Sequence, residues 1–224
     1  MVSPWIIQWP DTSPPIESPH VMNEHPSLIL IMLAIGTYVL HIWREDLLAW
    51  KNGRPNPGAL PGATTAPNNA CAIAIAGALV ILTAETSGEI AFGLDQEQST
   101  ITVFFGLYTL MAAFVEELIF RGFIVVENKG RALRWIGIIG ASAAFAALHP
   151  FLWKWDDGEL TGTLTVKGWF STVIVFVSSL WFYMIRFASF NVNRSLLPCI
   201  AAHAAKNLGV FAIKGAQGFV SGWW

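Results

Sequence analysis

The sequence predicts an all-α protein, a polytopic bundle of about six transmembrane helices, and three observations support this fold class. Hydrophobic residues make up 54% of the 224 positions and charged residues only 12%, whereas charged residues make up about 25% of soluble domains. The mean hydropathy is +0.52. Several apolar runs approach the roughly 20 residues with which a helix crosses a hydrocarbon core. Because these runs lack the period-two alternation of membrane strands, helices are favoured over a β-barrel.

Six stretches approach the length and composition of a membrane span. They cover Leu28 to Trp43, Ala70 to Ala91, Thr100 to Val126, Leu133 to His149, Trp169 to Ser189 and Leu196 to Ile213. The second stretch has a short purely apolar part, and Glu85 and Glu89 fall in its last turns. We expect these two carboxylates to lie at a solvated outer helix end rather than to do acid–base work.

Basic residues predict the orientation of these spans, because Lys and Arg in short connections stay on the cytoplasmic side. The first, third and fifth connections and their flanks hold most of them: Arg44, Lys51, Arg54, Lys129, Arg131, Arg134, Arg186 and Arg194. The second connection is acidic, and the fourth mixes both signs. We therefore expect both termini outside, with the protein in the plasma (inner) membrane if its source is prokaryotic.

Composition divides the chain into four parts. Residues 1–27 form a polar N-terminal segment that lacks Lys and Arg, and so lacks the positive region of a signal peptide. Residues 28–99 hold two predicted helices and a Pro-rich loop, residues 100–213 hold four more helices, and residues 214–224 form a C-terminal tail. The net charge of −2 and the lack of a basic stripe argue against a nucleic-acid partner.

Three charges interrupt the apolar run that contains the third span: Glu116, Glu117 and Arg121. A charge at the bilayer centre costs about 2.5–3.5 kcal/mol on insertion scales, so such residues are usually paired or functional. On a helix Glu117 and Arg121 share one face, whereas Glu116 points about 100° away from Glu117. We therefore expect an internal salt bridge between Glu117 and Arg121, with Glu116 facing the bundle cavity without a charged partner.

Two further pairs with helical spacing lie in later spans, Phe145 with His149 and His203 with Asn207. A poorly solvated carboxylate such as Glu116 is a competent general base for water, and His149 could share that water and pass a proton to a leaving group. The N–H donors of His203 and Asn207 could stabilise an oxyanion. Phe145 is expected to pack on His149 and fix its rotamer. These are the parts of peptide-bond hydrolysis without a nucleophilic serine.

The same residues resemble three motifs of a known family. Glu116-Glu117-Leu-Ile-Phe-Arg121, Phe145-Ala-Ala-Leu-His149 and His203-Ala-Ala-Lys-Asn207 are similar to those of the CPBP intramembrane proteases. That family unites type II CAAX prenyl endopeptidases with bacterial proteins linked to bacteriocin processing and immunity. The resemblance spans about Thr100 to Ile213 and implies that residues 100–213 are a catalytic membrane core with a CAAX-protease-like fold.

The resemblance also implies a role for each residue. Glu116 is the expected catalytic glutamate and His149 its partner in activating water, while His203 and Asn207 stabilise the oxyanion. Glu117, Arg121 and Phe145 are expected to support the site. Lys206 departs from the apolar filler expected inside the third motif; it either snorkels or meets a carboxylate.

Two questions stay open at the level of sequence. Zinc could accept Glu116, His149 and His203 as ligands, but no His-Glu-x-x-His occurs, and the resemblance favours a glutamate mechanism without a cofactor. The expected function is an intramembrane endopeptidase acting on a protein or peptide substrate, membrane-anchored or lipidated. The alternatives are a non-enzymatic immunity or scaffold protein on the same fold, and a proton-coupled transporter, against which the few spans and the lack of a repeat argue.

Overall fold

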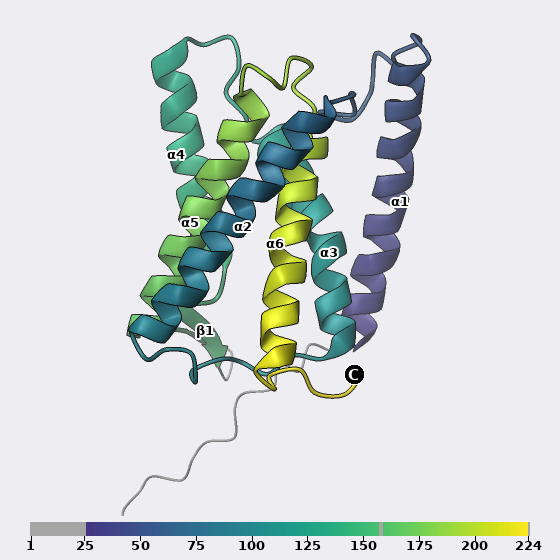
Figure 1. Cartoon of the computed structure of the whole chain (residues 1–224). Helices are drawn as coiled ribbons and strands as arrows, with labels where there is room; N and C mark the ends of the chain where they lie inside the picture. The colour runs from purple at the N-terminus through teal and green to yellow at the C-terminus, as the bar shows by residue number, and fades with distance from the viewer. Residues whose placement is uncertain (1–25, 157–158, 224) are drawn as a thin grey trace, which may run out of the picture.

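In the computed structural model, which describes residues 26–156 and 159–223, the helices form one bundle (Figure 1). The six α-helices and one π-helix of this part are α1 (Pro26–Lys51), α2 (Asn68–Ala91), α3 (Val103–Glu117), η1 (Leu118–Phe123), α4 (Arg131–Leu148), α5 (Val166–Phe187) and α6 (Leu197–Ala216). The predicted all-α bundle is confirmed. Most of the predicted N-terminal segment, residues 1–25, lies outside the described residues.

Five helices in the described ranges are long and apolar enough to cross a membrane: α1, α2, α3 together with η1, α4 and α5. Large hydrophobic side chains such as Val80 and Ile136 are exposed on them, as expected for surfaces that face lipid. The chain is thus an integral membrane protein. The sixth helix, α6, differs from the expected apolar span because it carries His203, Lys206 and Asn207. It packs between α2 and α3 (Figure 1), where Lys206 binds Glu85 of α2 and Asn207 binds the Thr109 carbonyl of α3.

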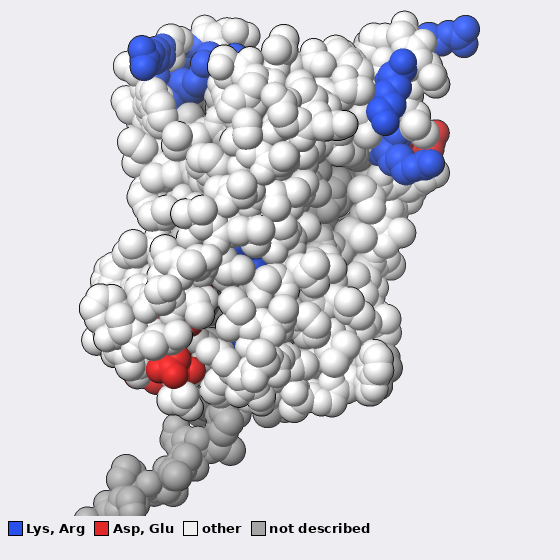
Figure 2. Space-filling view, viewed as in Figure 1, with Lys and Arg blue, Asp and Glu red and all other residues white. Residues whose placement is uncertain are grey.

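The connections rich in Lys and Arg share one end of the bundle. The α1–α2, α3–α4 and α5–α6 connections all lie at the upper end in Figure 1, and the α2–α3 connection lies at the other. Figure 2 shows most Lys and Arg of the visible face at the upper end, and an acidic patch at the lower end. The fold therefore places the connections rich in Lys and Arg at one end of the bundle and the acidic α2–α3 connection at the other, as the charge pattern of the sequence predicts.

A short β-hairpin between α4 and α5 departs from the purely helical expectation. Strand β1 (Trp153–Asp156) pairs antiparallel with β2 (Glu159–Gly162), with Trp153 opposite Gly162. An Asp-Gly dipeptide at 157–158 separates the two runs, which is a strong hairpin signal in a sequence. From the sequence, this segment was expected only to be the connection between the fourth and fifth spans.

Helix starts near the hairpin end are set by threonine caps. The hydroxyl oxygen of Thr102 accepts a hydrogen bond from Phe105 N at 3.1 Å at the start of α3, and that of Thr165 accepts from Gly168 N at 3.0 Å at the start of α5. Each cap satisfies a backbone donor that the helix leaves free. At its other end α3 continues directly into η1, so the expected helix from Thr100 to Val126 changes its winding after Glu117.

Glycines decide how closely some helices approach. A Cβ added at Gly77 of α2 would lie 2.1 Å from the Trp181 ring of α5, and one at Gly106 of α3 would lie 2.3 Å from the Phe211 ring of α6. These glycines are required by packing. At Gly140 of α4 an added Cβ would meet open space.

Candidate active site

The buried salt bridge between Glu117 and Arg121 lies at the centre of the polar site. Both side chains have no exposed surface, and Nη1 of Arg121 donates to Oε1 of Glu117 at 3.0 Å. The pairing expected from the i,i+4 spacing is confirmed. Nη2 of Arg121 lies 2.6 Å from the Ser179 hydroxyl of α5, which lies 3.0 Å from the Ser142 hydroxyl of α4. The bridge therefore links α3 and η1 to α5 and, through Ser179, to α4.

Side chains from α5 satisfy carbonyls around η1 and so hold Arg121 in place. The Tyr183 hydroxyl lies 2.6 Å from Phe120 O and 2.9 Å from Ile124 O. Nε of Arg186 donates to the Arg121 carbonyl at 3.0 Å. Short π-helical segments occur often at functional sites, because they redirect side chains within a helix. Here η1 begins directly after the two glutamates.

His203 of α6 is held by the same carboxylate that binds Arg121. Its Nδ1 lies 2.8 Å from Oε1 of Glu117, and its ring stacks on Phe182 with ring centroids 4.9 Å apart. With the carboxylate as acceptor, Nδ1 carries a proton. Oε2 of Glu117 is buried without a hydrogen-bond partner. This contact was not predicted from the sequence, because residues 117 and 203 are far apart in the chain.

Glu116 differs from Glu117 in its surroundings. Its side chain is 32% exposed, while Glu117 is fully buried. Oε2 of Glu116 lies 3.6 Å from Nε2 of His203. Glu116 was expected to be unpaired, but α6 brings the His203 imidazole alongside its carboxylate. The two adjacent glutamates thus lie on either side of one histidine.

His149 lies just beyond the last residue of α4, where Pro150 ends the helix. Proline disfavours helical geometry in the residue before it, and His149 has an extended backbone (φ −78°, ψ 130°). Its Nδ1 lies 2.8 Å from the Phe145 carbonyl. Because a carbonyl only accepts, Nδ1 carries the proton and Nε2 is left as an acceptor in the neutral ring.

Phe145 connects the two histidines through ring contacts. Its ring centroid is 4.8 Å from that of His149 and 6.2 Å from that of His203, both with edge-to-face geometry. The guanidinium carbon of Arg121 lies 4.6 Å from the same ring centroid. The expected packing of Phe145 on His149 is confirmed, and the ring also packs against the rest of the site. No direct hydrogen bond joins the two histidines in the described part of the chain.

Asn207 lies one turn after His203 on α6. Its Nδ2 donates to the Thr109 carbonyl of α3 at 3.0 Å. An amide nitrogen carries two hydrogens, so one remains for another acceptor. The contact fixes the side chain between α3 and α6.

A second polar network joins α2 to α5 and α6. Nζ of Lys206 lies 2.6 Å from Oε2 of Glu85, and Lys167 forms an ion pair with Glu89. Gln98 donates to Glu89 at 2.8 Å. The expectation of solvated carboxylates at positions 85 and 89 is wrong, since their side chains are only 17% and 12% exposed. Lys206 meets a carboxylate, one of the two outcomes expected for it.

Metal binding depends on how closely the ligands converge. Among the residues that the structure describes, no group of three or more His, Cys, Asp or Glu side chains is placed to hold a metal ion. Of the possible zinc ligands, Glu116 and His203 lie together, and the Phe145 ring lies between His203 and His149.

A family model matches the segment that carries these residues. The family model described as "Type II CAAX prenyl endopeptidase Rce1-like" matches residues 98–209. No curated protein and no solved structure matches the chain. The matched residues make up half of the 224 positions and include all three polar motifs. The chain therefore belongs to the type II CAAX prenyl endopeptidase Rce1-like family.

Proposed function

We propose that this membrane protein is an intramembrane endopeptidase that hydrolyses a peptide bond in or near the membrane. The observation that carries the proposal is the geometry around Glu116, a partly accessible carboxylate 3.6 Å from Nε2 of a histidine. Membership of the CAAX endopeptidase family supports the same reaction class. Both lines of support concern the segment that contains the three motifs.

The two glutamates differ in burial, and we assign them different roles. Glu117 is enclosed and binds Arg121 and His203, so it positions the site. Glu116 is reachable by solvent and is the general base. A water molecule that touches Oε2 of Glu116 lies within reach of Nε2 of His203, which helps to orient it.

The reaction consumes one water molecule. Glu116 takes a proton from the water, and the water oxygen attacks the carbonyl carbon of the scissile peptide. The electron pair of the C=O double bond moves to its oxygen and forms an oxyanion. When the oxyanion collapses, the C–N bond breaks, and the nitrogen receives the proton that Glu116 took. The products are a carboxylic acid and an amine.

His203 and Asn207 stabilise the oxyanion in this scheme. Asn207 has one N–H free beyond its bond to Thr109, and His203 donates from Nε2 when both ring nitrogens carry protons. Preorganised donors of this kind each contribute about 2.7–4 kcal/mol to a transition state. Their fixed contacts to Thr109 and Glu117 reduce the reorganisation needed during the reaction.

His149 passes the proton to the leaving nitrogen. Its Nδ1 is held by the Phe145 carbonyl, so Nε2 accepts the proton from Glu116 and then donates it. Because His149 lies across the Phe145 ring from His203, we place the scissile bond over the edge of that ring.

The substrate is a protein or peptide, membrane-anchored or lipidated, that reaches the site from the bilayer. We propose that the end rich in Lys and Arg faces the cytoplasm, with both chain termini outside, in a plasma (inner) membrane if the source is prokaryotic. We propose a glutamate mechanism without a cofactor. Metal analysis of the purified protein and activity after chelator treatment test this, and restoration of activity by zinc alone would overturn it.

Glu116→Gln tests the base assignment, because glutamine keeps the shape and removes the basic oxygen. Membrane and secreted proteins from cells that make either form are compared for new peptide termini, and we expect the processed termini to disappear with the variant. Glu127→Gln, which changes an exposed acid after η1, is the matched control. Processing that persists with Glu116→Gln, at equal amounts of folded protein, would contradict the proposal and favour the scaffold function.

A further inference from the structure

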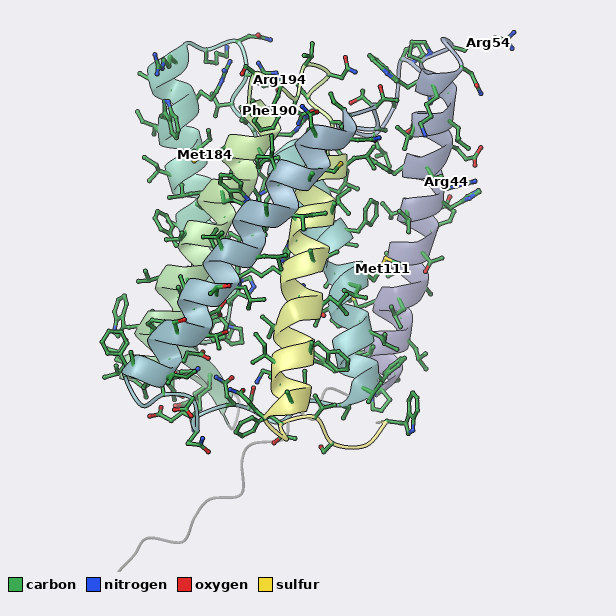
Figure 3. All side chains as sticks on the ribbon, in the orientation of Figure 1. Arg44, Arg54, Met111, Met184, Phe190 and Arg194 are labelled. Carbon is green, nitrogen blue, oxygen red and sulfur yellow. The ribbon has the colours of Figure 1, made fainter. Side chains whose placement is uncertain are left out.

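Two arginine side chains from different segments lie over one aromatic ring at the basic end of the bundle, and a third arginine precedes that ring in sequence. The guanidinium carbon of Arg134, in the first turns of α4, lies 5.2 Å from the Phe187 ring centroid, and that of Arg194 lies 4.9 Å from it. Arg186 precedes Phe187 at the end of α5 and is only 5% exposed. We call these three residues the arginine cluster. Figure 3 shows Arg194 at the upper end of the bundle, in the connection from α5 to α6.

Each member of the arginine cluster has a buried nitrogen without a hydrogen-bond acceptor. Nε of Arg134, Nη1 of Arg186 and Nη1 of Arg194 are all buried without a partner. No ion pair joins any of the three to a carboxylate in the described residues. The exposed carboxylate of Glu127 attracts Arg186 electrostatically but forms no ion pair with it. Like charges close together repel, and buried donors without acceptors are costly. The cluster therefore has the composition of a site whose anion comes from outside the chain.

The backbone of Arg194 gives a second reason to regard the cluster as a binding site. Arg194 has φ 51°, in the left-handed region that residues other than glycine rarely adopt. Such strain persists where the surroundings impose it, and it is concentrated at binding sites. Here the strained backbone places the Arg194 side chain over Phe187 and beside the end of α5.

The surroundings of the cluster favour a lipid as the source of the anion. α4 and α5, which pack on each other, expose large apolar side chains below it, among them Leu133 and Ile136 of α4 and Met184 of α5. These are surfaces along which acyl chains pack. Exposed Lys129 and Arg131 add positive charge at the same end. Basic pockets between membrane helices at this level bind the head groups of anionic lipids.

We propose that Arg134, Arg186 and Arg194 form a binding site for the phosphate of an anionic phospholipid, whose acyl chains lie along α4 and α5. Guanidinium groups suit this ligand because their planar donors match phosphate oxygens in pairs. The site is separate from the glutamates and does not depend on the proposed proteolysis. It is nevertheless one hydrogen bond from the active centre, because Nε of Arg186 binds the Arg121 carbonyl.

Native mass spectrometry of the full chain in neutral detergent tests the proposal, with phosphatidylglycerol and phosphatidylcholine added in equal amounts. We expect one bound phosphatidylglycerol in preference to phosphatidylcholine. The variant Arg134→Gln/Arg194→Gln should lower the affinity by about tenfold or more, since hydrogen bonds to charged groups are lost. Arg186 is left unchanged because it also holds η1.

A matched control removes the same charge elsewhere at the same end. Lys51→Gln/Arg54→Gln changes two exposed residues, the last residue of α1 and one just after it, on the far side of the bundle from the cluster; Figure 3 labels Arg54 there. This control should retain the bound lipid with less than a twofold change. Equal loss in both variants, or equal binding of the two lipids, would overturn the proposal. Full competition by millimolar inorganic phosphate would overturn the lipid assignment in favour of a soluble anion.

If the double variant yields little folded protein, the single variants Arg134→Lys and Arg194→Lys replace it. Lysine keeps the charge and loses the paired donors of arginine. We expect each to weaken binding of phosphatidylglycerol without changing the elution volume in size-exclusion chromatography. Unchanged lipid binding in both would overturn the site.

Discussion

Nδ1 of His203 lies 2.8 Å from Oε1 of Glu117, the oxygen that also accepts a hydrogen bond from Arg121. One buried carboxylate thus fixes the imidazole on α6 and the guanidinium on η1 together. The geometry leaves Nε2 of His203 directed at Glu116. This arrangement makes Glu117 a positioning residue, whose loss affects both folding and the site.

Removal of either partner of the buried bridge should lower stability strongly. Glu117→Ala leaves Arg121 without its carboxylate, and Arg121→Ala leaves Glu117 without its guanidinium, so we expect a loss of about 3–5 kcal/mol in each case. Folded yield by fluorescence-detected size-exclusion chromatography and the thermal midpoint measure this. Glu45→Ala, at an exposed ion pair of α1, is the control and should change little. Wild-type midpoints for both buried variants would refute the structural role of the bridge.

The pair formed by Lys206 and Glu85 should show strong coupling in a double-mutant cycle. Lys206→Met or Glu85→Gln alone leaves a poorly exposed charge unpaired, and each should destabilise the protein by more than the double variant does. Thermal unfolding of the four proteins gives the coupling. If the single effects simply add, the pair does not connect α2 to α6 energetically. Processing by the double variant then tests whether Lys206 contributes to the reaction.

His149→Ala should abolish processing while the protein stays folded. The side chain is half-buried at a helix end, and its hydrogen bond goes to the Phe145 carbonyl of its own chain segment. Loss of general acid–base catalysis lowers the rate by about 10²–10⁴-fold. Turnover of a reporter substrate measures the effect, with membrane insertion and elution volume as controls. A variant that only raises KM at unchanged kcat would place His149 in substrate binding instead.

Two glycine substitutions separate helix packing from helix propensity. Gly77→Ala places a methyl group against the Trp181 ring, and we expect a loss of about 1–3 kcal/mol from overpacking. Gly140→Ala enters open space on α4 and should be neutral, or stabilising by about 0.5–1 kcal/mol, because alanine favours helices. Thermal midpoints compare the two. A higher thermal midpoint for Gly77→Ala than for Gly140→Ala would show that the Trp181 ring moves aside easily.

Much of the site was predictable from local spacing. Glu117 and Arg121 are four positions apart, as are Phe145 and His149, and on a helix this spacing brings each pair together. The contact of His203 with Glu117 was not predictable in this way, since it depends on how α6 packs against α3 and η1. The partners of Glu85 and Glu89 were missed for the same reason. Local sequence shows that a carboxylate is present but not which lysine of another helix reaches it.

By itself the sequence determined the helical membrane bundle, because long apolar runs have few stable forms other than helices in lipid. It also determined the Glu117–Arg121 bridge and the three polar motifs, which follow from periodicity within single segments. Only the tertiary structure decided that one carboxylate serves both Arg121 and His203, that α3 becomes a π-helix after Glu117, and that Arg134 and Arg194 meet over Phe187. The physical reason is that periodicity fixes contacts within one helix, whereas contacts between helices depend on their tilt, rotation and axial register, which are set by packing of the whole bundle.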